Sequence, residues 1–221
     1  MQPCRVGLIG GTGIEGRGIA LRLAAAGLEV SVGSRKADRA REVAGELNRK
    51  LGVDRVRGID NSALIGQSEV LFLAVPFVHA DAVLHEHRER FSGGQILVDL
   101  TVPVVFDGGP RLLELPEGSG AEHVRTRIPS DLPLVAAFKT LPAHLLAENE
   151  LPLDCDEFIC SDSADAKKRV LELVGKIPRL RWVDAGPLSA SRGLEAMTLL
   201  AVGINRRYKI KASRFQLVGL S

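Results

Sequence analysis

The sequence predicts an α/β fold in which a doubly wound, mostly parallel sheet is flanked by helices. Short apolar runs that suit buried strands alternate with longer stretches whose apolar residues recur at helical spacing. A content of only 4% aromatic residues, beside abundant small and aliphatic ones, fits such a sheet. Because neither an internal repeat nor a low-complexity linker appears, the 221 residues are predicted to form a single domain with a C-terminal extension.

The first predicted strand, over residues 6–9, leads through a glycine-rich turn into a helix that is apolar at helical spacing over residues 19–26. Gly11, Gly13 and Gly16 in this turn match the pattern G-x-G-x-x-G. One glycine makes the tight turn, one lets the backbone approach a pyrophosphate, and one lets the helix pack on the strand. Glycine-rich turns also end strands for steric reasons alone. A second strand over residues 28–32 completes a β-α-β unit, so a Rossmann NAD(P)-binding fold is predicted.

The end of that second strand predicts which dinucleotide is bound. Proteins that prefer NAD place an Asp or Glu there, which binds the ribose 2′-hydroxyl and repels a 2′-phosphate. Here Ser34 and Arg35 follow the strand, and the first acid is Asp38. Arg39 lies four residues after Arg35 and shares its helical face. A hydroxyl and two guanidinium groups suit a phosphate dianion, so NADP(H) is predicted; a solvated cationic helix face is the alternative.

The next units alternate in the same way. A helix over residues 37–50, an ambiguous strand over 53–59 and a short helix capped by Asn61 or Ser62 lead to a buried strand over 69–75. Val75 and Pro76 end this strand at the sheet edge where open α/β sheets bind ligands.

Phe77 directly precedes the next helix, which is predicted over residues 78–91. Its ring is predicted either to cover a ribose of the nucleotide or to pack under that helix. His79 lies near the same sheet edge, and its role stays open. His85 and His87 are expected on a polar helix surface, because their spacing does not place two metal ligands on one helical face.

The second half of the chain is predicted to extend the sheet. A strand over residues 95–100 is followed by a long segment, 104–130, in which glycine and proline cluster. This segment is expected to be a loop that covers the substrate, with a disordered excursion as the alternative. Further strands are predicted over 132–138, 158–160 and 180–184, with helices over 164–175 and from about residue 189 to residue 205. The last helix is apolar enough to be buried or to meet a second subunit.

Composition argues against several other classes of protein. The net charge of +2 is too small, and its cations too spread out, to predict a nucleic-acid surface. No apolar segment reaches the roughly 18 residues that a membrane span needs. The N-terminus runs directly into the first strand, so no secretory signal is expected and a cytoplasmic protein is predicted. The three cysteines include no Cys-x-x-Cys pair and are expected to be reduced thiols, with no metal site.

Several of these motifs occur together in one known family. The chain resembles the NADPH-dependent coenzyme F420 reductases (F420H2:NADP oxidoreductases) from about residue 5 to residue 205. The glycine loop is common to many dehydrogenases, whereas Asp-Ala-Gly-Pro-Leu from Asp184 and the Pro-Ala pair at 142–143 are more particular to this family. The matching segments are 10–13 with 16–18, 33–35, 75–80, 139–143, and 184–189 with 191–192.

The resemblance implies reversible hydride exchange between NADP(H) and the 5-deazaflavin coenzyme F420, on a domain that pairs into a homodimer. It implies NADP contacts at Thr12, Gly13, Ile14 and Glu15, a 2′-phosphate site at Ser34, Arg35 and Arg39, and a nicotinamide side near Phe77, Asp81 and Ala143. The deazaflavin is implied to lie over the nicotinamide, against the turn of Lys139, Thr140, Leu141 and Pro142. The expected division is an NADP-binding domain over 3–205, with the acceptor site at its carboxyl sheet edge, and a basic C-terminal segment over 206–221.

Lys139 departs from the resemblance, since a member of that family has His at the matching position. A cation there would stabilise negative charge on a reduced deazaflavin ring, whereas a solvent-facing lysine at a strand end is the commoner arrangement. The acceptor is therefore open: a flavin, ferric ion, or a small imine or keto acid are alternatives, and a non-catalytic NADP(H)-binding regulator is another. No catalytic acid or base is predicted, because hydride passes directly between rings held roughly 3–3.5 Å apart.

Overall fold

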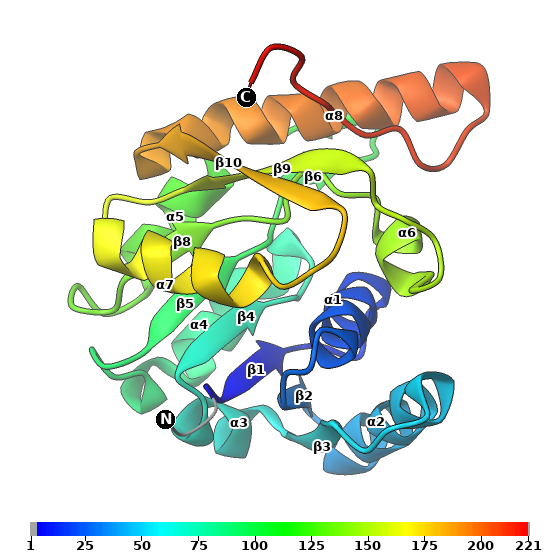
Figure 1. The fold of residues 1–221 in the computed structure, drawn as a ribbon. Coiled ribbons are helices and arrows are strands. Elements are labelled where there is room, and N and C mark those ends of the chain that lie inside the picture. The colour runs from blue at the N-terminus through cyan, green and yellow to red at the C-terminus, as the bar shows by residue number, and fades with distance from the viewer. Residues whose placement is uncertain (1–3, 221) are drawn as a thin grey trace.

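The computed structural model describes residues 4–220 and contains an eight-stranded sheet with helices on both faces (Figure 1). The doubly wound α/β prediction is confirmed. The strands of this sheet are β1 (Val6–Ile9), β2 (Val30–Ser34), β3 (Val56–Asp60), β4 (Val70–Leu73), β5 (Ile96–Asp99), β8 (Leu134–Ala136), β9 (Cys155–Cys160) and β10 (Leu180–Gly186). Two short strands, β6 (Val104–Val105) and β7 (Arg111–Leu112), pair separately as a hairpin.

The order of the strands in the sheet reverses at β1, next to the glycine loop. The order is β10-β9-β8-β5-β4-β1-β2-β3, so the chain builds outward from β1 to β3 and then returns to the other side of β1 with β4. β1 pairs in parallel with both β2 and β4, with Leu8 opposite Val32 and Phe72. Open α/β sheets bind ligands at the carboxyl ends of the strands on either side of such a switch point.

Helices cover the sheet in two layers, each with its own core. On one face lie α1 (Ile14–Ala25), α2 (Ala37–Leu51), α6 (Ala143–Ala147) and α7 (Ala164–Val174). On the other face lie α3 (Asn61–Gln67), α4 (Phe77–Glu86), α5 (Gly120–Arg127) and α8 (Ser191–Tyr208). All four residues of β1 and of β4 are buried, as expected for central strands covered on both sides.

The last two strands depart from the parallel arrangement. β9 and β10 are parallel to each other, but β9 pairs with β8 in the antiparallel sense through Ala136 and Cys160. The start of β9 therefore lies beyond the carboxyl end of β8. As a result, side chains from early β9 reach the sheet edge where the ligand site is predicted.

The segment 104–130 is more ordered than the sequence predicted. It contains the β6–β7 hairpin and helix α5, so the expectation of a long irregular loop or a disordered excursion was wrong. Ser119 caps α5 by accepting a hydrogen bond from the Glu122 backbone N–H, and its hydroxyl donates to the Glu122 carboxylate. This N-cap secures the helix start despite the neighbouring glycines.

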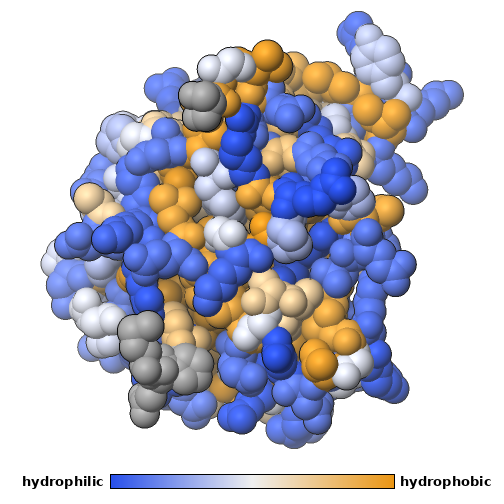
Figure 2. All heavy atoms as spheres, in the orientation of Figure 1, coloured by the Kyte–Doolittle hydropathy of each residue, from blue (hydrophilic) through white to orange (hydrophobic). Residues whose placement is uncertain are grey.

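Helix α8 continues to Tyr208 and so crosses the predicted domain boundary at 205–206. The chain then returns along β9: the Asp156 backbone N–H donates to the Phe215 carbonyl at 2.9 Å, and Arg181 donates to the carbonyls of Leu217 and Leu220. Figure 2 shows apolar residues gathered over α8 and this C-terminal segment. Two large side chains of α8 are well exposed, Leu200 at 57% and Tyr208 at 69%.

Within residues 4–220, none of the helices combines the length and hydrophobicity that crossing a bilayer requires. The three cysteines are free thiols, of which Cys155 and Cys160 are buried and Cys4 is half-buried. Burial raises the pKa of both Cys155 and Cys160 to about 12, which disfavours the reactive thiolate.

Candidate cofactor site

A pocket of about 350 Å³ lies at the carboxyl ends of β1, β2 and β4. It is therefore at the switch point of the sheet, where the sequence predicted a nucleotide site. His79, whose role the sequence left open, also lines it. Six residues predicted to bind the cofactor line this pocket, namely Thr12, Gly13, Ser34, Arg35, Val75 and Pro76.

The glycine loop has the shape that the sequence predicted. Gly10 has φ +71°, a left-handed conformation that closes the turn after β1. A Cβ on Gly16 would lie 2.6 Å from the Gly11 Cα, so this glycine permits the close packing of helix and loop. At Gly13, by contrast, the nearest atom to an added Cβ is the Gly10 carbonyl oxygen at 3.9 Å. The open side of the loop is thus at Gly13, which lines the pocket.

The start of α1 is available to an anion. Gly13 is the N-cap of α1, and no side chain caps this helix end. Because the first N–H groups of a helix have no partner within the helix, they can donate to a phosphate, and the helix dipole adds to the attraction. The predicted contacts Gly11, Ile14 and Glu15 do not line the pocket: Gly11 lies buried beneath the loop, Ile14 is exposed and Glu15 is half-buried.

Asn61 supports the glycine loop from below, a role that the sequence did not predict. Its side-chain oxygen accepts a hydrogen bond of 3.2 Å from the Gly10 backbone N–H, and the residue is 4% exposed. The sequence suggested Asn61 as a helix cap, but Asp60 caps α3 by accepting from the Ala63 N–H at 2.9 Å. Residues 60–62 are all of types that can cap a helix, so the sequence does not tell which of them does. Their roles are distinguished by the hydrogen bond between Asn61 and Gly10, which lie far apart in the sequence.

The predicted 2′-phosphate site divides into two parts. Ser34 and Arg35 line the pocket at the end of β2, and the Ser34 hydroxyl accepts a 3.3 Å hydrogen bond from the Lys36 backbone N–H. Arg39 lies outside this lining and forms an ion pair with Glu42, both side chains being about half exposed. An exposed pair of this kind contributes less than about 1 kcal/mol, so Arg39 can readily exchange Glu42 for another anion.

Phe77 and Asp81 on α4 contact helix α5 instead of lining the pocket. The Phe77 ring packs on the His123 ring with centroids 5.5 Å apart. Asp81 lies 2.9 Å from His123 Nε2, and Glu117 lies 3.2 Å from the other ring nitrogen. The Phe77 ring thus packs on α5, which neither alternative foresaw, and its contact with a ribose of the nucleotide stays a prediction.

The turn 139–142, predicted to hold the acceptor, is mostly buried. Lys139 is 3% exposed, and its Nζ lies 2.8 Å from Asp99 Oδ2 and 3.4 Å from Glu195 Oε1. Burial disfavours the charge, but the two carboxylates outweigh it and raise the pKa of Lys139. The expectation of a solvent-facing lysine was wrong, and the ammonium does not face an open pocket. Ala143, predicted on the nicotinamide side, begins α6 directly after this turn and is half-buried.

Glu157 is a third buried carboxyl at this turn. It is fully buried, and the Thr140 hydroxyl donates to its Oε2 at 2.6 Å. Burial raises the pKa of Glu157 to about 7, although hydrogen bonds from Thr140 act in the opposite sense. The sequence did not single out Glu157, because its position depends on the antiparallel pairing of β9 with β8.

Replacing Glu157 with Gln is expected to make the free energy of unfolding less dependent on pH. The folded protein holds the Glu157 proton up to about pH 7, whereas an unfolded Glu releases it near pH 4.3. The stabilisation linked to this proton is complete below about pH 4 and is lost as the pH rises through 7, a change of up to about 3 kcal/mol. Guanidinium unfolding at pH 5 and pH 8 measures the difference.

Glu29→Gln is the matched control for this prediction, because Glu29 is exposed. Its unfolding free energy should fall between pH 5 and pH 8 as much as that of the unmodified chain. If Glu157→Gln shows the same fall, the buried carboxyl does not hold its proton near neutral pH.

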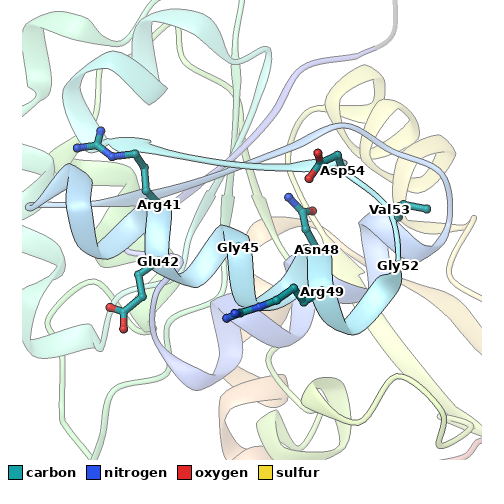
Figure 3. Close-up of a pocket in the computed structure, with 8 residues that line it drawn as sticks. All are labelled: Arg41, Glu42, Gly45, Asn48, Arg49, Gly52, Val53 and Asp54. Atoms are coloured by element: carbon teal, nitrogen blue, oxygen red, sulfur yellow. The ribbon is translucent and has the colours of Figure 1, made fainter.

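A second hollow, larger than the pocket at the glycine loop, is separate from this site. It measures about 650 Å³ and lies along α2 and the turn that follows it (Figure 3). Its lining carries charges of both signs, and Arg41 and Glu42 point to opposite sides of the helix (Figure 3). None of its lining residues belongs to the predicted site, so its size alone does not make it the cofactor pocket.

Comparisons with known proteins show which proteins this chain resembles. A family model described as "NADP oxidoreductase coenzyme F420-dependent" matches residues 5–103. An F420-dependent NADP reductase from Methanocaldococcus jannaschii is 32% identical, over 98% of this chain and 99% of that protein. A protein of the same description from Methanothermobacter marburgensis is 33% identical over 98% of this chain and 99% of its own.

A solved structure is similar over nearly the whole chain. It is that of a candidate F420-dependent NADP reductase from Arthrobacter sp. FB24, with a TM-score of 0.81 and 22% sequence identity. The match covers 96% of this chain and 98% of that one. At this identity the likeness supports the fold, and the family is indicated by the sequence relatives.

Proposed function

The chain belongs to the coenzyme F420-dependent NADP oxidoreductase family, and on this premise we propose that it transfers a hydride between NADP(H) and a deazaflavin of the F420 type. The observation that carries the proposal is the pocket in which the glycine loop, the free start of α1 and Arg35 meet. These groups can hold the pyrophosphate and the 2′-phosphate, which are both attached to the adenosine ribose of NADP.

The pocket offers hydrogen-bond donors and enough room for the phosphates of NADP(H). Gly13 leaves room for a pyrophosphate to approach the first N–H groups of α1. Ser34 and Arg35 follow at the end of β2, with no carboxylate among them to repel a 2′-phosphate. Val75 and Pro76 follow β4 on the other side of the switch point and line the pocket there, where the nicotinamide end is proposed to lie.

The reaction requires little from protein side chains. The bound nicotinamide and the deazaflavin supply the redox chemistry between them. The chain holds the two rings at a reacting distance, excludes water and fixes their orientation. Each hydride passed to the oxidised acceptor is accompanied by uptake of one proton, so that NADPH, acceptor and H⁺ give NADP⁺ and the reduced acceptor.

Steady-state oxidation of NADPH with three acceptors tests the proposal. We expect rapid turnover with a deazaflavin, much slower turnover with FMN or FAD, and only background oxidation without an acceptor. Faster turnover with the flavins would assign the chain to flavin reduction instead. NADPH binding without turnover by any acceptor would indicate a nucleotide-binding regulator. NADH in place of NADPH serves as the control for the phosphate site.

We further propose one NADP-binding domain and a homodimer formed through α8; because α8 continues to Tyr208, the basic segment predicted over 206–221 begins within this helix. The α8 face carries an open hollow of about 560 Å³ lined by residues such as Leu200, Ile204 and Tyr208, and these are the apolar residues that a partner copy would cover. A cytoplasmic location stays a prediction from the sequence.

A further inference from the structure

The turn 139–142 begins at a strained backbone position. Phe138 has φ 58°, a left-handed conformation that is costly for a residue with a bulky side chain. Its ring is fully buried and packs edge-on against two rings, with centroids 6.0 Å from Phe72 and 5.0 Å from Trp182. The backbone cannot relax without withdrawing this ring from the core, so packing holds the strain in place.

Lys139, the next residue, joins the turn to three other elements. Its ammonium contacts Asp99 at the end of β5 and Glu195 on α8, and it donates to the Thr101 carbonyl. Glu195 in turn accepts hydrogen bonds from the first N–H groups of α5, from Gly120 at 2.9 Å and Ala121 at 3.3 Å. The ammonium is thus the centre of a buried network that connects β5, α5 and α8 to the turn.

The backbone and the second residue of the turn are also fixed. The Thr198 hydroxyl on α8 donates to the Lys139 carbonyl at 2.6 Å. Thr140 donates to the buried Glu157 carboxylate from β9. The first three residues of the turn are each less than a tenth exposed, and only Pro142 is half-buried. The side chains of Lys139 and Thr140 therefore point into the protein and leave Pro142 to meet a ligand.

The charge of the network argues against a direct electrostatic role for Lys139. One ammonium lies between two carboxylates, Asp99 and Glu195, so the group as a whole presents no excess positive charge to an acceptor. The ammonium can instead fix the position of the turn, because a buried ion pair with several partners holds the backbone of Lys139 in one place. A misplacement of about 1 Å between reacting groups costs roughly 100-fold in rate.

We propose that Lys139 is a positioning residue for hydride transfer: through Asp99 and Glu195 it fixes the turn against which the acceptor lies, and it does not contact the acceptor. This inference rests on the proposed function, since it assigns the turn to the acceptor side of that reaction. The positioning role explains how this turn can contain a lysine while the acceptor site gains no positive charge, because Asp99 and Glu195 neutralise the ammonium.

Thr198→Val tests the positioning role without disturbing the buried charges. The change removes the hydroxyl that holds the Lys139 carbonyl while keeping the shape of the side chain. We expect kcat with a deazaflavin to fall about tenfold and the Kd for NADPH to change less than twofold. The matched control is Thr126→Val, because the Thr126 hydroxyl also donates to a backbone carbonyl, that of His123 at 2.8 Å, but lies on α5 away from the turn. Its kcat should stay within twofold of the unmodified chain.

Trp182, the one tryptophan of the chain, gives a readout that needs no acceptor. Its ring contacts Phe138, so loosening of the turn should increase the quenching of its fluorescence by acrylamide. We expect the quenching constant to rise at least 1.5-fold in Thr198→Val and to stay unchanged in Thr126→Val. Equal effects of the two variants, on quenching or on kcat, would overturn the proposal.

Glu195→Gln separates positioning from direct electrostatic catalysis by the sign of its effect. If Lys139 acted on the acceptor by its charge, removing a neutralising carboxylate would increase its influence and raise kcat. The positioning role predicts a fall in kcat, because the contact between Lys139 and Glu195 loosens. If the unmodified chain reduces no deazaflavin, the proposed function fails; the tryptophan measurement still shows whether the network fixes the turn.

Discussion

Gly13→Ala is expected to weaken NADPH binding about 100-fold while changing the free energy of unfolding by no more than about 1 kcal/mol. The added methyl group meets nothing within 3.9 Å, and Gly13 has φ −73°, which any residue adopts without strain. The fold should therefore accept the change. The methyl group would nevertheless occupy the space through which a pyrophosphate reaches the first N–H groups of α1. Fluorescence titration with NADPH and guanidinium unfolding measure the two quantities.

Gly45→Ala is the matched control for this variant. Gly45 lies in the hollow on α2 drawn in Figure 3, and a Cβ added there meets nothing within 4 Å. It also fills open space with one methyl group, but it should leave NADPH affinity unchanged. Gly13→Ala should weaken NADH binding by the same factor as NADPH binding, because both dinucleotides contain the pyrophosphate. Undiminished NADPH affinity in Gly13→Ala would show that the nucleotide does not lie on this loop.

The sequence could predict the glycine loop and the pocket beside it because their determinants are local. Gly11, Gly13 and Gly16 act over a few residues, and each fills a steric or hydrogen-bonding role that the turn itself defines. Ser34 and Arg35 follow directly after a strand, so they reach the same edge of a parallel sheet. The order of strands was then constrained by the right-handed crossovers that β-α-β units require.

The burial of the turn 139–142, where the acceptor is proposed to lie, could not be predicted in the same way, because its determinants are distant in the sequence. Lys139 is buried by Asp99 and Glu195, which lie 40 residues before it and 56 residues after it. Glu157 reaches Thr140 only because β9 reverses its direction relative to β8. Neither pairing leaves a local pattern of residues. A lysine at a strand end is ordinarily solvated, and only tertiary contacts overrule that expectation.

Helix α5 shows a different reason for a wrong prediction. Its residues 118–120 read Gly-Ser-Gly, which indicates a turn, and the segment lies among further prolines and glycines. The capping signal Ser119 with Glu122 was present but was outweighed by that composition. The helix is stabilised further by Glu195, which accepts hydrogen bonds from its first backbone N–H groups. That partner lies on α8, so the helix start depends on the assembled fold as well as on its own sequence.

Arg35→Asp is expected to raise the KM for NADPH about 100-fold and to change the KM for NADH less than threefold. Hydrogen bonds between charged groups contribute about 1.5–3 kcal/mol, and the new carboxylate adds repulsion of the 2′-phosphate. In NADH the ribose carries a 2′-hydroxyl, which a carboxylate accepts as a hydrogen-bond partner. The preference between the two dinucleotides should therefore shift toward NADH. Initial rates at saturating acceptor, with each dinucleotide in turn, measure the two constants.

Two further arginine variants separate the local contact from the general charge of α2. Arg49→Asp makes the same change of charge near the far end of the helix, and its KM for NADPH should rise less than twofold, because exposed charges beyond about 10 Å are screened at 0.1 M salt. Arg39→Asp should have an intermediate effect, since Arg39 must leave Glu42 before it can bind the phosphate. The expected order of effect on the KM for NADPH is Arg35, then Arg39, then Arg49. Equal effects at all three positions would mean that α2 attracts the nucleotide by its overall charge, and the assignment of the 2′-phosphate to Arg35 would then be wrong.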